Sequence, residues 1–236
     1  MDIKILHLLE GAREAKGLTV IIDVFRAFST ACYVYHAGAA TIRPVAFIDD
    51  AFKLKEQYPD FLLMGERNEI KPHGFDYGNS PYYLLTADLK GKTLVHTTSA
   101  GTQGITAATN ATEIITGSFV NADAVVNYIN FRKPDHVSLV CMGYACQYPT
   151  DEDSLCAEYF YKKLHNQQVD FNNMVRQIKN GSGKRFFEKH KQEWAPQQDF
   201  ELCLNINRFN FVLNVRQDAI GTLLLKTEPP FFVKDI

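Results

Sequence analysis

The sequence lacks the features that mark several classes of protein. It has no apolar run of about 20 residues, the length that spans a bilayer. Its first residues, 1–7, lack the basic start and apolar middle of a signal peptide. It also lacks a surplus of one charge, because 25 Lys and Arg stand against 27 Asp and Glu. We therefore expect a cytoplasmic protein with no membrane partner and no nucleic-acid partner.

Several patterns of reactive sites are missing as well. The five cysteines are an odd number without a Cys-x-x-Cys pair, which argues against a disulfide framework and against structural zinc. No arginine follows Cys141 or Cys146 at the spacing of a cysteine-phosphatase loop, and no P-loop ending is present. A haloacid-dehalogenase phosphatase would need an aspartate two residues after Asp23, where Phe25 stands.

What is present is the pattern of an α/β protein. Hydrophobic residues make up 46% of the 236 residues, and short apolar runs rich in β-branched residues alternate with segments of helical period. This alternation predicts a largely parallel sheet with helices on both faces and some antiparallel strands. Since no Pro-, Gly- or Ser-rich linker divides the chain, we predict one domain over residues 1–236.

The predicted elements can be given by their ranges. Strands are expected at 4–9, 18–24, 41–47, 61–65, 93–97, 113–116, 136–142 and 211–215. Helices are expected at 27–36, 49–57, 80–87, 101–108, 122–131 and 152–165, with more helix in 166–200.

Polar residues crowd the places where predicted strands end, which is where open α/β sheets bind ligands. The first such cluster holds Asp23 and Arg26 directly after an apolar strand. A carboxylate at this position suits a hard metal ion such as Mg²⁺, and an arginine suits a phosphoryl or sulfonate oxygen. An ion pair that only caps the following helix explains the same two residues equally well.

The second cluster is a long loop, 64–81, with little apolar content. Loops of this length in compact domains are usually functional or disordered. It offers Glu66 and Asp76 as metal ligands or bases and Arg67 as an anion partner. Asn79 and Ser80 precede Pro81 as helix caps do, a role that does not exclude ligand contact.

Three later strand ends add further candidates. Small residues that could face an anion follow the strand at 93–97, namely Thr98, Ser99, Gly101 and Thr102. Ser118 and Asn121 follow the strand at 113–116, where Asn121 is most simply a helix cap. At the last of these ends, Glu152 is a spare carboxylate beside a capping pair.

Together, these clusters resemble the 2-phosphosulfolactate phosphatases of coenzyme M biosynthesis and their bacterial relatives. The resemblance is carried by segments 22–27, 65–67, 74–81, 97–102, 117–122 and 152–153. It implies a three-layer α/β/α fold with a mixed, largely parallel sheet, dependence on Mg²⁺, and hydrolysis of 2-phospho-3-sulfolactate to 3-sulfolactate and phosphate. The implied partner is a small anionic phosphoester, and a homodimer is an open alternative to a monomer.

We assign roles to these candidates as a hypothesis. The expected catalytic residues are Asp23, Arg26, Glu66, Arg67 and Asp76. The expected substrate-binding residues are Asn79, Thr98, Ser99, Gly101, Thr102, Ser118 and Asn121. The expected Mg²⁺ ligands are Asp23 and Asp76, with Glu66 or Glu152 assisting.

The chain departs from the family pattern at a few positions. Ala100 stands where the family usually has Asn, and Asn68-Glu69 stands where it usually has two glycines. Gln147 lies in a loop that commonly carries a cation. These departures favour the alternative function, a non-catalytic binder of a small phosphorylated or sulfonated acid on a degenerate site.

Overall fold

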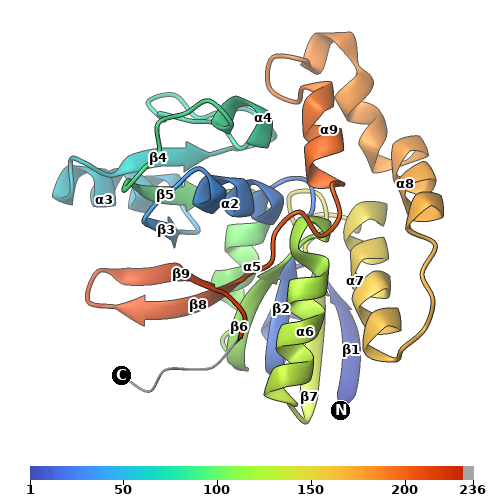
Figure 1. The fold of residues 1–236 in the computed structure, drawn as a ribbon. Coiled ribbons are helices and arrows are strands. Elements are labelled where there is room, and N and C mark those ends of the chain that lie inside the picture. Colours follow the sequence, from blue (N-terminus) through green and yellow to red (C-terminus); the bar gives the residue numbers. More distant parts are fainter. Residues whose placement is uncertain (231–236) are drawn as a thin grey trace.

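The computed structural model describes residues 1–230 and arranges them around one mixed sheet (Figure 1). Its order is β1-β7-β2-β6-β8-β9-β3-β5-β4. The strands are β1 (Asp2–His7), β2 (Gly17–Ile22), β3 (Thr41–Pro44), β4 (Leu62–Gly65), β5 (Thr93–Thr97), β6 (Ala111–Gly117), β7 (His136–Cys141), β8 (Val212–Asp218) and β9 (Gly221–Thr227).

The sheet consists of two parallel blocks. β1, β7, β2 and β6 form the first, and β3, β5 and β4 form the second. The β8–β9 hairpin joins them through three antiparallel contacts, β6–β8, β8–β9 and β9–β3. Because three reversals separate the blocks, their strands run in opposite directions. The tail therefore contributes the antiparallel strands that the sequence predicted.

Helices cover both faces of the sheet, which gives the three-layer α/β/α arrangement that the sequence led us to expect. The α-helices are α1 (Leu8–Glu14), α2 (Ala27–His36), α3 (Ile48–Gln57), α4 (Pro81–Leu84), α5 (Gly101–Ala107), α6 (Ala122–Arg132), α7 (Asp151–Leu164), α8 (Phe171–Asn180) and α9 (Gln197–Cys203). The 3₁₀ turns are η1 (Phe119–Asn121), η2 (Ser182–Phe187) and η3 (Lys189–Lys191).

The alternation of side chains along β2 shows how the two cores form. Val20 and Ile22 point to one face and join the cluster of α6 and α7, whereas Ile21 points to the other face and joins the cluster of α2 and α5. All three side chains are fully buried. At roughly 1.5–3 kcal/mol for each buried aliphatic side chain, such strands hold the sheet between its helical layers.

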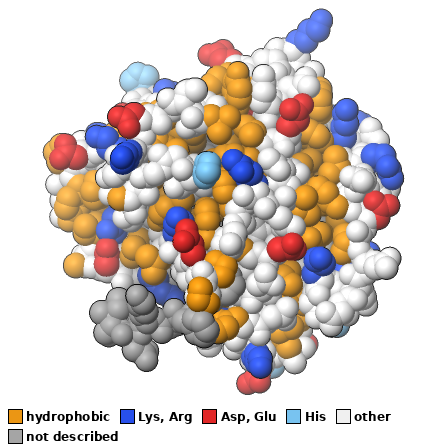
Figure 2. All heavy atoms as spheres, in the orientation of Figure 1, with side chains coloured by type: hydrophobic (Ala, Val, Ile, Leu, Met, Phe, Trp, Pro, Cys, Tyr) orange, Lys and Arg blue, Asp and Glu red, His pale blue; other side chains and the backbone are white. Residues whose placement is uncertain are grey.

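The elements overlap the predicted ones, with two omissions among residues 1–230. The range 4–9 was expected to be all strand, but α1 begins at Leu8 without a side-chain cap. β9 was not predicted. No helix in this part of the chain is both long enough and apolar enough to cross a membrane. Figure 2 shows acidic and basic side chains interspersed over one face, without a broad area of one sign.

Candidate functional site

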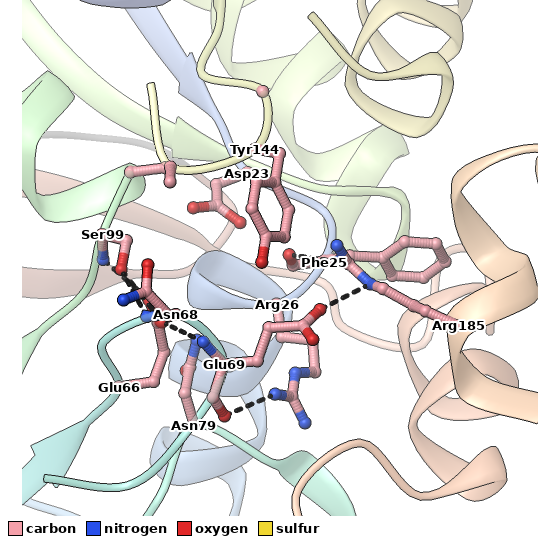
Figure 3. A pocket seen from close by; sticks show the side chains of 13 residues that line it. Asp23, Phe25, Arg26, Glu66, Asn68, Glu69, Asn79, Ser99, Tyr144 and Arg185 are labelled. Atoms are coloured by element: carbon pink, nitrogen blue, oxygen red, sulfur yellow. Dashed lines mark hydrogen bonds and ion pairs between the residues drawn. The ribbon is translucent and has the colours of Figure 1, made fainter. Parts of the chain in front are cut away.

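One pocket collects residues that follow strands of both blocks (Figure 3). Asp23 follows β2 and Tyr144 follows β7 in the first block, whereas Glu66 follows β4 and Ser99 follows β5 in the second. Arg185, from η2, lines the pocket on the side opposite Glu66 and Ser99. Segments that follow strands of both blocks therefore meet at this pocket, although the strands of the two blocks run in opposite directions along the sheet order.

Asp23 is held at the start of α2 and is almost fully buried. Its Oδ1 accepts a hydrogen bond from the Ala27 N–H at 3.1 Å, and 5% of the residue is exposed. Burial raises the pKa of the Asp23 carboxyl to about 6; the Ala27 N–H acts in the opposite direction, and the charge of Glu66 raises it further. A cation at this place would relieve the repulsion between the two carboxylates.

Glu66 ties the long loop to the segment after β5. Its Oε1 accepts from the Ser99 N–H at 2.6 Å, and its Oε2 accepts from the Ser99 hydroxyl at 3.0 Å and from the Glu69 N–H at 2.8 Å. These three donors hold both oxygens of the Glu66 carboxylate and suit its ionised form, since N–H and O–H donors bind an anionic acceptor more strongly. The contacts thus fix this carboxylate in the pocket that Asp23 also lines.

Arg26 is anchored by a carboxylate far along the chain. Its Nη1 donates to Asp199 Oδ2 and to the Trp194 carbonyl, both at 2.6 Å. Asp199 is fully buried and also accepts from the Ser80 hydroxyl and the Tyr82 N–H at 2.9 Å each. This network holds the guanidinium at the pocket wall, where its remaining donors can meet an anion.

Arg185 is a second arginine of the pocket. Its Nε lies 3.1 Å from Glu69 Oε1, and its Nη2 donates to the Phe25 carbonyl at 3.0 Å. The guanidinium carbon also lies 5.5 Å from the ring centre of Tyr144 and 5.2 Å from that of Phe186. These ring contacts orient the cation while leaving it charged.

The Thr98–Thr102 segment is a tight turn that supports the pocket from behind. The Thr98 N–H donates to Thr102 Oγ1 at 2.9 Å, and the Thr102 N–H donates to Thr98 Oγ1 at 3.1 Å. Their hydroxyls are therefore engaged with each other, and neither residue lines the pocket. Gly101 packs directly on Asp23, because a Cβ there would lie 2.8 Å from Asp23 Oδ2.

Ser118 and Asn121 are structural in this arrangement. Both are fully buried and form a capping box around η1. The Ser118 hydroxyl contacts that of Ser29 at 2.6 Å, and Asn121 Nδ2 donates to the Phe211 carbonyl at 3.2 Å. The structure does not bring either side chain to the pocket.

Arg67 and Asp76 also lie away from the pocket, because each satisfies backbone groups elsewhere. Arg67 donates to the Ala46 carbonyl at 2.8 Å and to Thr97 Oγ1 at 2.7 Å. Asp76 is exposed, and its Oδ2 accepts from the Leu63 N–H at 2.7 Å. We therefore do not retain the expected catalytic roles of these two residues.

Glu152 lies behind the pocket and does not line it. It is 2% exposed, and burial raises its pKa to about 7, against the opposing charge of Arg185. Its neighbour Asp153 clamps two strand ends, accepting from the Val24 N–H and from the Gly143 N–H at 2.8 Å each. Asp153 therefore supports the loops that carry Asp23 and Tyr144.

The four-carboxylate metal site expected from the sequence is not formed. Asp23 and Glu66 line the same pocket, but Asp76 and Glu152 do not. Within residues 1–230, no group of three or more His, Cys, Asp and Glu side chains is placed to hold a metal ion. Two carboxylates fit Mg²⁺ nonetheless, since proteins often bind this ion through one or two carboxylates together with substrate phosphate.

Asn79 lines the pocket, and its contact with His96 orients its side-chain amide. Its Oδ1 lies 3.2 Å from His96 Nε2. Burial lowers the pKa of His96 to about 3, and the charge of Arg67 acts in the same direction. The neutral imidazole can therefore donate to Asn79 Oδ1 and turn the amide nitrogen of Asn79 toward the pocket.

Sequence reasoning missed three residues that shape the site. Arg185 lies in η2, outside the segments that carry the family resemblance. Asp199 and Tyr144 carried no local signal, because their partners lie far away in the sequence. Contacts between residues so far apart in sequence cannot be predicted from local patterns.

The chain is similar to known proteins over most of its length. The family model described as 2-phosphosulpholactate phosphatase matches residues 4–218. A protein of Caldanaerobacter subterraneus, named probable 2-phosphosulfolactate phosphatase, is 32% identical over 222 residues, covering 86% of this chain and 89% of its own. One of Bacillus subtilis with the same name is 30% identical and covers 86% and 88%.

A third relative with that name, from Carboxydothermus hydrogenoformans, is 42% identical over 169 residues and covers 71% and 69% of the two chains. The match of the family model extends over nearly the whole chain and includes each strand-end segment that builds the pocket. The chain therefore belongs to the 2-phosphosulfolactate phosphatase family.

Proposed function

We propose that this protein hydrolyses a small phosphate monoester of the 2-phosphosulfolactate type with the help of Mg²⁺. The observation that carries the proposal is the meeting of Asp23 and Glu66 with Arg26 and Arg185 around one pocket (Figure 3). Carboxylates supply the oxygen ligands of a divalent cation, and arginines bind phosphoryl and sulfonate oxygens. The names of the relatives supply the substrate class.

The chain's own residues account for the main requirements of the reaction. Hydrolysis of a phosphate ester needs its oxygens neutralised and a water aligned opposite the leaving oxygen. Arg26, fixed by Asp199, is placed to hold an anionic oxygen. When bound, Mg²⁺ would supply further neutralisation of the phosphoryl oxygens. The attacking water adds to phosphorus as the bond to the ester oxygen breaks.

In this proposal Asp23 is a ligand of Mg²⁺, and a carboxylate that does not hold the ion acts as the general base. Burial raises the pKa of Asp23 to about 6, so its carboxylate is largely ionised at neutral pH and can bind the cation. The Ala27 N–H occupies Oδ1 and fixes the orientation of the carboxylate. Glu66 is more fully hydrogen-bonded, which suits a purely electrostatic role.

A phosphate-release assay over a panel of small phosphoesters, with and without Mg²⁺, tests the proposal. We expect release from 2-phosphosulfolactate in the presence of Mg²⁺ and a loss of two or more orders of magnitude in Asp23→Asn, with an unchanged circular dichroism spectrum. Near-normal turnover of that variant would refute the role of Asp23.

The alternative, a non-catalytic binder of a small phosphorylated or sulfonated acid, is favoured by one feature. Ala100 lines the pocket beside Ser99 but offers no side-chain donor. Binding of the ester by calorimetry together with no phosphate release under any metal condition would support this alternative.

A further inference from the structure

A glutamate occupies a turn position that glycine normally takes. Residues Arg67 to Ile70 form a tight hairpin turn, in which the Arg67 N–H donates to the Ile70 carbonyl at 2.9 Å and the reverse bond is 3.1 Å. Asn68 and Glu69, its two central residues, have φ of 51° and 71°. Turns with two left-handed residues strongly prefer Asn-Gly, so a glutamate in the second place is unfavourable for the backbone. Strain of this kind persists where surrounding contacts hold it.

The contacts of Glu69 all point into the candidate active site (Figure 3). Its Oε1 lies 3.1 Å from Arg185 Nε, and the two side chains are only 12% and 13% exposed. Its carbonyl accepts from Arg26 Nη2 at 3.4 Å, and its N–H donates to Glu66. The side chain thus spans the pocket from the loop after β4 to η2.

This arrangement leaves each arginine of the pocket paired with a carboxylate, but the two pairs differ. Asp199, the partner of Arg26, is fully buried and receives two further hydrogen bonds. The side chain of Glu69, by contrast, is held by its ion pair with Arg185. Glu69 can therefore leave its arginine without breaking a buried network, whereas Asp199 cannot.

Glu69 crosses a pocket that has little free space. The free space is about 30 Å³, room for only a few water molecules. Movement of the Glu69 carboxylate away from Arg185 would enlarge this space.

We propose that Glu69 is an internal occupant of the anion site at Arg185, displaced by the substrate's second anionic group, the carboxylate or sulfonate carried beside the phosphoester. The proposal rests on the proposed function and adds a determinant of selectivity to it. A substrate with a second anion replaces the charge of Glu69 and leaves Arg185 neutralised. A simple monoester brings no such group, so Glu69 keeps its arginine and continues to obstruct the pocket.

Binding of ligands without a phosphoester bond separates this idea from the hydrolysis itself. The affinities of 3-sulfolactate, lactate and inorganic phosphate are measured by calorimetry for the parent protein, Glu69→Gln, Arg185→Gln and the double variant. We expect Glu69→Gln to bind 3-sulfolactate about tenfold more tightly, with inorganic phosphate changed less than about twofold. In the Arg185→Gln background, the gain from Glu69→Gln should vanish, because the coupling runs through that pair.

Glu193→Gln is the matched control, since it removes a carboxylate from the wall of a neighbouring cavity that Glu69 also lines; its binding of 3-sulfolactate should not change. Lactate shows whether the carboxylate alone displaces Glu69 or whether the sulfonate is required. Equal tightening for inorganic phosphate, or a gain that persists without Arg185, would overturn the proposal. If no ester is hydrolysed but the binding pattern appears, the proposed function fails while this inference stands.

Discussion

Arg26 and Asp199 form a buried ion pair across 173 residues of sequence, with Nη1 and Oδ2 2.6 Å apart and side chains 4% and 0% exposed. The pair connects the start of α2, beside Asp23, to α9 in the C-terminal part of the chain. Burying two charges is costly, and the additional bonds from Ser80 and Tyr82 offset that cost at Asp199.

Removing one partner of this pair should destabilise the protein strongly. We expect Asp199→Asn to lower the free energy of unfolding by about 3 kcal/mol, because Arg26 is left as a buried charge without its counter-ion. Urea denaturation measures the loss. Asp50→Asn is the control, since its pair with Lys53 is exposed and should be worth less than about 0.5 kcal/mol. Equal effects of the two substitutions would contradict this explanation.

Binding of Mg²⁺ should depend on the protonation of Asp23. Its pKa is raised to about 6, so below pH 6 the ion must displace a proton. We expect the apparent affinity to fall about tenfold for each pH unit below 6 and to level off above it. Metal titrations followed by calorimetry at pH 5, 6, 7 and 8 test this. Asp23→Asn should bind weakly with no slope in this range; a parent affinity that is equal at pH 5 and pH 7 would exclude the linkage.

Acid should destabilise the fold partly through His96. Because its folded-state pKa of about 3 lies below the unfolded value near 6.5, the unfolded state binds more protons between these limits. The contribution is fully favourable above pH 6.5 and is lost, by up to about 1.4 kcal/mol per unit, as the pH falls toward 3. His96→Gln should therefore flatten the dependence of urea midpoints on pH between 6.5 and 4.5.

Exposed His190 provides the comparison for that experiment, since its side chain is 71% exposed. His190→Gln should leave the slope of the parent unchanged. A His96→Gln slope identical to that of the parent would mean that other groups account for the acid sensitivity.

Gly101 should tolerate no side chain. A Cβ at this position would lie 2.8 Å from both Asp23 Oδ2 and Ala27 Cβ, so the carboxylate would have to shift. We expect Gly101→Ala to reduce kcat/KM at least tenfold and to cost about 1–3 kcal/mol of stability. Gly78→Ala is the control, because its Cβ would meet Lys71 at an ordinary 3.6 Å. Unchanged kcat/KM in Gly101→Ala would show that the contact is relieved without moving Asp23.

Local sequence signals were sufficient for elements with clear periodicity and boundaries. α2 and β5 have the predicted bounds, Ala27–His36 and Thr93–Thr97, since each combines an apolar pattern with a distinct start. α1 was missed because it follows β1 without a loop, so that the apolar run over 4–9 has the pattern of one strand. β9 was missed because Leu223, Leu224 and Leu225 form a run without alternation, and its place between two parallel blocks is decided by tertiary pairing.

The site was predictable only in part, for a similar reason. Asp23 and Glu66 were expected to lie together because each follows a predicted strand, and the structure does bring them together. Side-chain direction within the long loop could not be inferred, and Arg67 and Asp76 turn to backbone groups of neighbouring segments. Arg185 and Asp199 depend on contacts more than 100 residues away in sequence, which no local pattern reports.

The opposed directions of the two parallel blocks have a mechanical consequence. Asp23 extends from one block and Glu66 from the other, and the β9–β3 ladder that completes the connection has a single registered pair, Ile42 with Leu224. A cation held by both carboxylates would bridge the blocks at a point remote from the hairpin. Such an ion would hold the two halves of the sheet together. Its removal by a chelator would then lower the stability of the whole fold as well as the activity.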